Sequence, residues 1–251
     1  MAIGLIVYDL LYLIVATSLY GAAGVVGVAA TKAVGGIVPL PFAVVPGTAA
    51  FLVALVALVG LAGLLLPNLR AGEYPLMRGP MFWSWLLRSL LRRVLYFAPI
   101  KVLLFTSNVL RWASLRALGA KVDFTVNMSS DVDLLDPALT TIEAGATVGA
   151  RCLVSAHYIK GGNLVLAPVH IGGGALLAVD VVVGPGVRIG RDCMLLGRVG
   201  LNRGVSVGEG ACLGASTITE PGVQVPAGAR VPFATILRRP RLPGDGAPQD
   251  E

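Results

Sequence analysis

The sequence predicts a three-sided parallel β-solenoid that follows a membrane-embedded helical region. Between Val165 and Arg230 an aliphatic residue returns at every sixth position, and a small or β-branched residue returns at the fifth position of each unit. Two long apolar segments precede this repeat. The whole chain is 55% hydrophobic and only 14% charged, which is too apolar for an ordinary soluble domain.

The repeat has eleven consecutive units, with ten aliphatic residues and one threonine in the first position. These residues are Val165, Ile171, Leu177, Val183, Ile189, Leu195, Leu201, Val207, Leu213, Thr219 and Val225. A period of six fits a coil with about six residues on each of three faces, in which every coil stacks on the previous one. Glycine is frequent in the second position, where we expect a tight corner to need a positive φ.

Residues 1–70 are predicted to form a transmembrane hairpin. Its two apolar segments, at about 3–30 and 48–66, are long enough to cross a bilayer. A connector that contains Gly35, Gly36, Pro39, Pro41 and Pro46 separates them. The first segment is too long for a signal peptide and lacks the basic region that would precede one.

The basic residues predict the orientation of the hairpin. The connector carries only Lys32, whereas six basic residues follow the second span, between Arg70 and Lys101. Positive charge gathers on the cytoplasmic side, so we expect a multi-pass protein of the cytoplasmic membrane with its N-terminus and solenoid in the cytoplasm. Asp9 is either a functional acid within the membrane or, on the simpler interpretation, a carboxylate at its interface.

Residues 71–121 are predicted to form basic amphipathic helices. The segments 81–97 and 100–118 mix Trp, Leu and Phe with basic residues, and they are separated at Pro99. Such helices lie in the headgroup layer of a membrane, and Gly119 is a plausible C-cap. A second interpretation, compatible with the first, is that both helices pack on the solenoid as a lid.

The solenoid is predicted over residues 122–236, with two interruptions before the regular stretch. The spacing of six slips by two residues after Leu134 and resumes at Ile142. Between Val154 and Val165 five extra residues occur near Lys160 to Asn163, and we expect a projecting loop there, where function concentrates. The Pro/Gly-rich tail, residues 237–251, is predicted to be disordered.

The repeat resembles that of the left-handed β-helix acyltransferases, in which aliphatic, Gly and small positions alternate with variable ones. The resemblance implies a left-handed coil and an acyl transfer in which a histidine near a projecting loop acts as general base. His157 lies at the second interruption and matches that pattern, and histidine exchanges protons near neutral pH. His170, in a regular unit, is the weaker candidate.

Direct transfer from a thioester is the implied mechanism, with backbone N–H groups at a corner of the coil stabilising the oxyanion. The carboxylate that orients His157 could be Glu143 or Asp131, or could come from another subunit. Covalent catalysis by Cys152 is disfavoured, because that residue is predicted to face inward. No metal site is expected: the γ-class carbonic anhydrases share the scaffold but use three histidines, and this chain has two.

A narrower resemblance rests on the order of the segments and on three short motifs, which cover nearly the whole chain. The motifs are Leu118-Gly119-Ala120-Lys121-Val122, Ser155-Ala156-His157-Tyr158 and Ala167-Pro168-Val169-His170-Ile171-Gly172. They are similar to the membrane-linked C-terminal repeats of poly-ε-lysine synthetase-type nonribosomal peptide synthetases. That resemblance implies aminoacyl thioesters on a carrier protein, an amine acceptor, and three copies per chain, so a single copy is expected to form a homotrimer.

Two departures from the repeat mark candidate substrate contacts. Leu196 and Asn202 replace corner glycines, and the usual C-terminal motif of acetyl-CoA-using relatives is missing. With Tyr158 and Asn163 at the interruption, Asn202 and Arg203 complete the predicted substrate-binding set.

The sequence therefore predicts a membrane-anchored acyltransferase. Its donor would be acyl-CoA or a phosphopantetheinyl carrier protein, its acceptor an amine or hydroxyl group, and it would hold no tightly bound cofactor. The alternative is a non-catalytic trimeric scaffold that docks a partner synthetase at the bilayer. The net charge of +6 comes without a nucleic-acid-binding motif, so we expect no nucleic-acid partner and assign the charge to the membrane surface.

Overall fold

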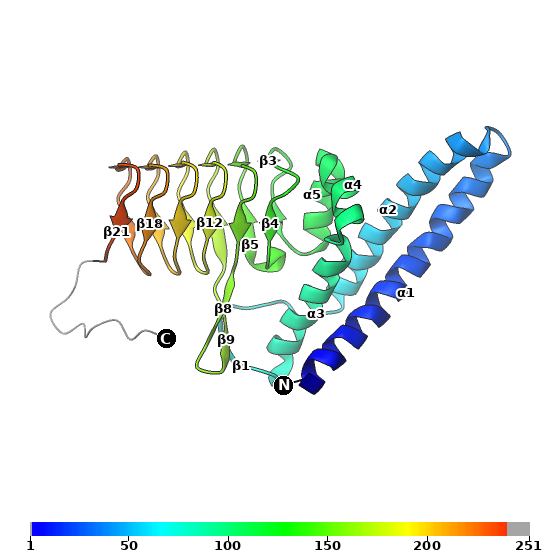
Figure 1. The fold of residues 1–251 in the computed structure, drawn as a ribbon, viewed down its shortest axis with the longest axis horizontal. Coiled ribbons are helices and arrows are strands. Elements are labelled where there is room, and N and C mark those ends of the chain that lie inside the picture. Colours follow the sequence, from blue (N-terminus) through cyan, green and yellow to red (C-terminus); the bar gives the residue numbers. More distant parts are fainter. Residues whose placement is uncertain (1, 240–251) are drawn as a thin grey trace.

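A computed structural model describes residues 2–239 of the chain, which form a parallel β-solenoid joined to a helical region (Figure 1). Two long helices project from one end of the molecule, three shorter helices lie between them and the solenoid, and the strands stack into six coils. Of the tail that was predicted to be disordered, residues 240–251 lie outside the described part.

Three six-stranded parallel sheets form the faces of the solenoid. The first face comprises β2 (Lys121–Val122), β5 (Thr140–Ile142), β10 (Val169–Ile171), β13 (Arg188–Ile189), β16 (Ser206–Val207) and β19 (Gln224–Val225). The second comprises β3 (Asn127–Met128), β6 (Thr147–Val148), β11 (Leu176–Leu177), β14 (Met194–Leu195), β17 (Cys212–Leu213) and β20 (Arg230–Val231). The third comprises β4 (Asp133–Leu134), β7 (Leu153–Val154), β12 (Val182–Val183), β15 (Gly200–Leu201), β18 (Ile218–Thr219) and β21 (Ile236–Leu237).

The register of these sheets confirms the predicted period of six. Ile171 lies beside Ile189, and Ile189 beside Val207, so each coil contains three units. The first-position residues from Ile171 to Leu213 are buried, as are the fifth-position residues Ala175, Val181, Val187 and Cys193. Burial of an aliphatic side chain stabilises a fold by about 1.5–3 kcal/mol, so this repeated inward row holds the coils together.

Glycine occurs in the second position for a different reason from the one predicted. Those in the second position do not adopt a positive φ; instead, a Cβ on Gly172 or Gly190 would lie 2.7 Å from backbone atoms of the next coil. Positive φ falls on the fourth position, where Gly174 alternates with non-glycine residues such as Asp180 and Arg198. Close stacking of the coils, and not the turn conformation, therefore requires glycine in the second position.

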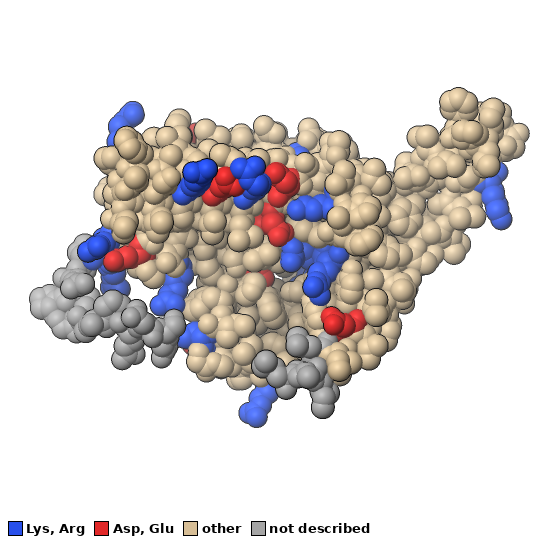
Figure 2. Space-filling model, viewed as in Figure 1, with Lys and Arg blue, Asp and Glu red and all other residues tan. Residues whose placement is uncertain are grey.

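Charged side chains line one corner of the coil, where they alternate in sign along the solenoid (Figure 2). Arg151 donates two hydrogen bonds to Asp180, at 2.7 and 2.8 Å, and the fields of Asp131 and Arg198 extend the alternation. The Arg151 guanidinium accordingly lowers the pKa of Asp180. Pairs this exposed contribute little to stability, and their main effect is a corner that is balanced in charge.

The second interruption of the coil is longer than predicted. Residues 155–168 leave the solenoid as a hairpin of β8 (His157–Lys160) and β9 (Asn163–Leu166), and β1 (Gly72–Pro75) pairs with β9 to complete a small antiparallel sheet. Val165 therefore belongs to the hairpin and not to the regular coil, which resumes at β10. The error arose because Val165 is aliphatic and lies six residues before Ile171, although the buried side chains of β9 are those of Leu164 and Leu166.

Helices α1 (Ala2–Gly35) and α2 (Leu40–Leu64) form the predicted hairpin, and both are long and apolar enough to cross a membrane. The connector is shorter than predicted. Pro41 lies in the first turn of α2, where its missing N–H costs nothing, and Pro46 lies inside the helix. In Figure 2 the protruding part of this hairpin shows almost no charged side chains.

Three shorter helices follow the hairpin. They are α3 (Gly79–Leu95), α4 (Ala98–Thr106) and α5 (Asn108–Ala117). The second predicted segment is thus two helices, because Ser107 accepts a hydrogen bond from the Leu110 N–H and begins a new one; the predicted C-cap, Gly119, has φ +91°.

Two basic side chains of these helices bind backbone carbonyl groups of the protein. Arg88 donates to the carbonyls of Gly63 and Leu66 at the end of α2, and the buried Arg111 donates to the Met128 carbonyl of the first coil. Cationic donors satisfy the free carbonyls at a helix end. Burial lowers the pKa of both guanidinium groups. These contacts agree with the lid interpretation, and the placement of the helices in a headgroup layer stays a prediction.

Candidate active site

Both interruptions of the repeat occur at the same corner of the solenoid. Strands β4 and β7 are neighbours in the third face, and the chain leaves the regular path directly after each of them. After β4 it forms the 3₁₀ turn η1 (Pro137–Leu139), and after β7 it forms the β8–β9 hairpin. This coincidence brings Asp136 and His157 together, although 21 residues separate them.

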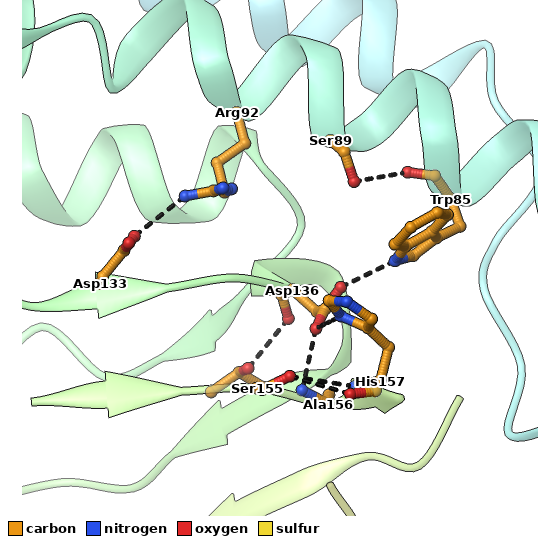
Figure 3. Close-up of polar contacts among 9 residues, drawn as sticks. Trp85, Ser89, Arg92, Asp133, Asp136, Ser155, Ala156 and His157 are labelled. Atoms are coloured by element: carbon orange, nitrogen blue, oxygen red, sulfur yellow. Dashed lines mark hydrogen bonds and ion pairs between the residues drawn. The ribbon is translucent and has the colours of Figure 1, made fainter. Parts of the chain in front are cut away.

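His157 and Asp136 form a close dyad (Figure 3). The Nδ1 atom of His157 lies 2.6 Å from Oδ2 of Asp136, and the side chains are 23% and 2% exposed respectively. A carboxylate only accepts hydrogen bonds, so Nδ1 carries the proton and Nε2 keeps its lone pair. Among residues 2–239 nothing bonds Nε2, which leaves that atom available to take a proton from a substrate.

Two further donors fix the carboxylate of Asp136. The indole Nε1–H of Trp85 donates to Oδ1 at 2.9 Å, and the backbone N–H of Ala156 donates to Oδ2 at 2.9 Å. The Trp85 ring also meets the His157 ring edge-on, with 4.9 Å between centroids. Figure 3 shows Trp85 reaching the dyad from α3, so a helix beside the predicted membrane anchor forms one wall of the site.

The two carboxylates considered from the sequence do not orient His157. Glu143 follows β5 on the first face and lies 3.2 Å from Nε2 of His170; the N–H of Gly173, followed by the charges of His170 and Arg191, lowers its pKa. Asp131 lies near the second face and accepts a hydrogen bond from Ser129. Glu143 and Asp131 therefore lie at other corners of the coil than His157, and the prediction that either carboxylate orients His157 was wrong.

Three of the four predicted substrate contacts lie on the His157 corner. The Arg203 guanidinium lies over the Tyr158 ring, 5.3 Å from its centroid, although the two are distant in sequence. Asn202 accepts a hydrogen bond from the Arg203 N–H and lines an open groove on the third face, together with Gly184 and Ile218. Their roles as binding residues stay predictions.

Asn163, the fourth predicted contact, lies away from the dyad. It pairs with Lys160 beside the hairpin turn, whereas His157 pairs with Leu166 at the base. Three residues of strand separate the two ends, about 10 Å. The Asn163 side chain donates to Glu73 of β1 at 2.7 Å, so it ties the hairpin to the segment that follows α2.

Cys152 lacks the features of a nucleophile. Its side chain is buried, its Sγ lies 2.9 Å from the Ala178 carbonyl oxygen, and burial raises its thiol pKa. The thiolate is the reactive form of cysteine, so the environment of Cys152 favours the unreactive thiol.

Trp85 and Asp136 are the site residues that the sequence interpretation missed. A signal for Asp136 was present, since the two-residue slip after Leu134 precedes the second interruption by one coil. Trp85 had no comparable signal. It belongs to a segment interpreted as a membrane anchor, and it reaches the site only through the packing of α3 on the coil.

Comparisons with known proteins add one relative by sequence. No family model matches the chain. The delta-poly-L-ornithine synthetase of Acinetobacter baumannii (strain AB307-0294) is 34% identical over 107 residues, which are 43% of this chain and 8% of that protein. The chain thus spans a small part of the relative's length.

Solved structures share the coil only loosely. A perosamine N-acetyltransferase from Caulobacter crescentus has a TM-score of 0.35 and 19% identity, over 54% of this chain and 62% of its own. The acetyltransferase domain of PglB from Neisseria gonorrhoeae FA1090 has a TM-score of 0.27 and 13% identity, over 51% and 57%.

The assignment accordingly rests on the chain's own repeat and strand order. Three parallel sheets share one register, and an inward aliphatic residue returns every six positions. By these features the chain folds as a parallel β-solenoid built from hexapeptide repeats.

Proposed function

We propose that this protein is a membrane-anchored acyltransferase in which His157 acts as general base. The observation that carries the proposal is the His157–Asp136 dyad, with Nδ1 held by a buried carboxylate and Nε2 available. Efficient proton transfer requires a base with a fixed orientation and the correct tautomer. Asp136, Ala156 and Trp85 supply that orientation.

In the proposed reaction an amine or hydroxyl group attacks the carbonyl carbon of a thioester. His157 Nε2 accepts the proton of the attacking group as the new N–C or O–C bond forms. The C–S bond then breaks, and the leaving sulfur takes the proton from the imidazolium. The acyl group has moved from sulfur to the acceptor, and one proton has moved from the acceptor to sulfur. His157 returns to its starting protonation state.

The donor is proposed to be a thioester, on coenzyme A or on a phosphopantetheinyl carrier protein. The open groove lined by residues that include Gly184, Asn202 and Ile218 lies on the third face, over the coils that follow the dyad, which suits an extended thioester arm. The similarity to a delta-poly-L-ornithine synthetase favours an aminoacyl group and an amine acceptor.

Anchoring and assembly are part of the same proposal. Helices α1 and α2 would cross the cytoplasmic membrane, with the N-terminus and the solenoid in the cytoplasm, and three copies would associate through their solenoids. A carrier protein or synthetase would deliver the acyl group from solution, while α3 holds the dyad close to the membrane surface.

The test measures thiol release and product mass with the full chain in detergent. Acetyl-CoA and an ornithyl thioester of N-acetylcysteamine serve as donors, and ornithine as the acceptor. We expect His157→Asn to lower the rate by about 10²–10⁴-fold, while His170→Asn, the matched change at the other histidine, leaves it nearly unchanged. Equal rates for the wild type and His157→Asn would remove the proposed base. Inactivity of the wild type with both donors, together with stable capture of a purified synthetase, would favour the scaffold.

A further inference from the structure

A second polar site lies between the membrane helices and the first coil. It is an open pocket, and its lining includes Asp9 and Tyr12 of α1, Arg92 and Arg93 of α3, and Lys101 of α4, together with Asp133 of β4. Asp133 is three residues before Asp136, and Arg92 is two helical turns beyond Trp85. The pocket is therefore about 10 Å from the dyad along α3.

Basic groups outnumber carboxylates in this pocket, since three basic side chains share it with Asp9 and Asp133. Arg92 forms an ion pair with Asp133 at 2.9 Å. Arg93 lies over the rings of Tyr8 and Tyr12, at 5.3 and 5.5 Å. Within residues 2–239 it has no carboxylate partner inside 4.0 Å. The pocket thus holds a fixed cation on an aromatic surface, free to meet an anion.

Several hydrogen-bond donors in the pocket lack an acceptor. Arg92 Nε and the Tyr96 hydroxyl are both buried and without a partner in the part of the chain that the structure describes. Lys101 donates to the Val132 carbonyl at 3.0 Å and lies 4.7 Å from the Tyr96 ring centroid, which leaves two of its three N–H groups. Buried donors without acceptors are costly, so the chemistry of this pocket suits a ligand with several acceptor oxygens.

The position of the pocket indicates where such a ligand would come from. Asp9 and Tyr12 lie in the first turns of α1, the longer of the two helices able to cross a membrane, and α3 follows α2 on the same side. Basic pockets at this level of membrane proteins recognise lipid head groups. Guanidinium groups suit phosphate in particular, since they offer paired donors to its oxygens.

We propose that this pocket binds a phosphate group presented from the bilayer, with Arg93 and Lys101 as its principal contacts. The site is separate from the dyad and does not depend on acyl transfer. It would hold a phosphorylated amphiphile beside α1 and α3, at the membrane surface and close to the catalytic corner.

The experiment titrates the full chain in detergent with dioctanoyl-phosphatidylglycerol and follows the bound ligand by native mass spectrometry. Dioctanoylglycerol, which lacks the phosphate, is the ligand control, and we expect it not to bind. Arg93→Gln and Lys101→Gln are each expected to weaken phosphatidylglycerol binding about tenfold, the effect of losing one charge-assisted hydrogen bond. Arg78→Gln, an equal loss of charge at the exposed start of α3, should have no effect.

Several outcomes would overturn the proposal. Equal weakening by Arg78→Gln would mean a diffuse surface attraction, and unchanged binding in Arg93→Gln and Lys101→Gln would remove the site. A parallel titration with coenzyme A separates the sources of phosphate: dependence on Arg93 for coenzyme A alone would exclude the bilayer as the source. His157→Asn should bind phosphatidylglycerol normally, so failure of the lipid site and failure of the acyltransferase proposal remain distinguishable.

Discussion

At the scale of single residues, Asp136 is the group on which the site depends. Its carboxylate accepts hydrogen bonds from Trp85 in α3, from the Ala156 backbone and from the His157 ring. These donors come from distant parts of the sequence. The carboxylate depends on them because it is buried and cannot form hydrogen bonds with water instead. A side chain that only accepts hydrogen bonds suits this position, because all three neighbouring groups are donors. A side chain that also donates would place one of its donors against another.

Replacing Asp136 with Asn is expected to damage both activity and stability. One end of the amide must face a donor with its own NH₂ group, so either the imidazole changes tautomer or a buried donor loses its partner. We expect about a 10²-fold fall in the transfer rate and a loss of about 1–3 kcal/mol in unfolding free energy, measured by thiol release and by denaturant titration. Asp131→Asn, on the exposed corner, is the control; equal effects of the two variants would argue against a dyad.

Cysteine reactivity provides a second prediction. Burial raises the thiol pKa of Cys152 and of Cys193, so at about pH 8 fewer of these thiols are ionised than in an exposed cysteine. We expect iodoacetamide to modify both about tenfold more slowly than it modifies the half-exposed Cys212. Mass spectrometry of digested peptides gives the three rates, and denaturation should equalise them. Rapid modification of folded Cys152 would restore it as a candidate nucleophile.

The site was predictable from sequence only where the repeat itself carried a signal. His157 could be found because a histidine at an interruption stands out against inward aliphatic positions. Asp136 lies in a slip of only two residues, and its meaning depends on which corner that slip occupies. The contact of Trp85 requires the packing of α3 against β4 and η1, which no local pattern encodes.

At the scale of elements, the coils are held at fixed spacing by glycines that touch the next coil. A Cβ on Gly190 would lie 2.7 Å from Glu209 N, whereas a Cβ on Gly200 would meet only a side-chain carbon of Ile218 at 3.9 Å. The first contact is with rigid backbone and the second is ordinary packing. The same substitution should therefore have opposite consequences at these two positions.

Gly190→Ala is expected to destabilise the solenoid by about 1–3 kcal/mol through overpacking. Gly200→Ala should be neutral or stabilising by up to about 1 kcal/mol, because alanine restricts the unfolded chain. Thermal melting followed by circular dichroism compares the two variants in one detergent. A loss at Gly200 as large as that at Gly190 would mean that stacking distance does not explain the corner glycines.

Periodicity also explains which elements were predictable. The coils from β10 onward follow directly from the spacing of six, since each first-position residue must face inward. The β8–β9 hairpin was underestimated because Val165 of β9 lies six residues before Ile171 and so matches that spacing. The division between α4 and α5 depends on the cap at Ser107, a local bond too weak to dominate the apolar pattern of the segment.

At the scale of the whole molecule, the helical region and the solenoid form one unit. Their buried residues make a continuous core, β1 pairs with the hairpin that carries His157, and Trp85 of α3 contacts the dyad. Strand β1 therefore contacts the hairpin that carries His157, and helix α3 contacts the dyad itself. A structural change in the helical region should therefore alter the geometry of the dyad. A flexible tether between the two regions would not transmit such a change.

Orientation in the membrane is testable by labelling. We expect Lys32→Cys, near the tip of the hairpin, to react with a membrane-impermeant maleimide in intact spheroplasts, because a double crossing places that tip outside. Gln224→Cys, exposed on the first face, should react only after the membrane is opened. Site-resolved mass spectrometry separates both positions from the native cysteines. Labelling of both in intact spheroplasts would contradict the proposed topology.

The three-unit coil also limits how such a protein can change length. Removing a single six-residue unit beyond β12 would move every later strand to the neighbouring face, and Arg203 would leave the corner of Tyr158. Removing eighteen residues would return each strand to its own face and shorten the molecule by one coil, about 4.8 Å. Because the dyad lies within the first two coils, the length of the adjoining groove can be adjusted over evolution in such steps while the catalytic corner stays unchanged.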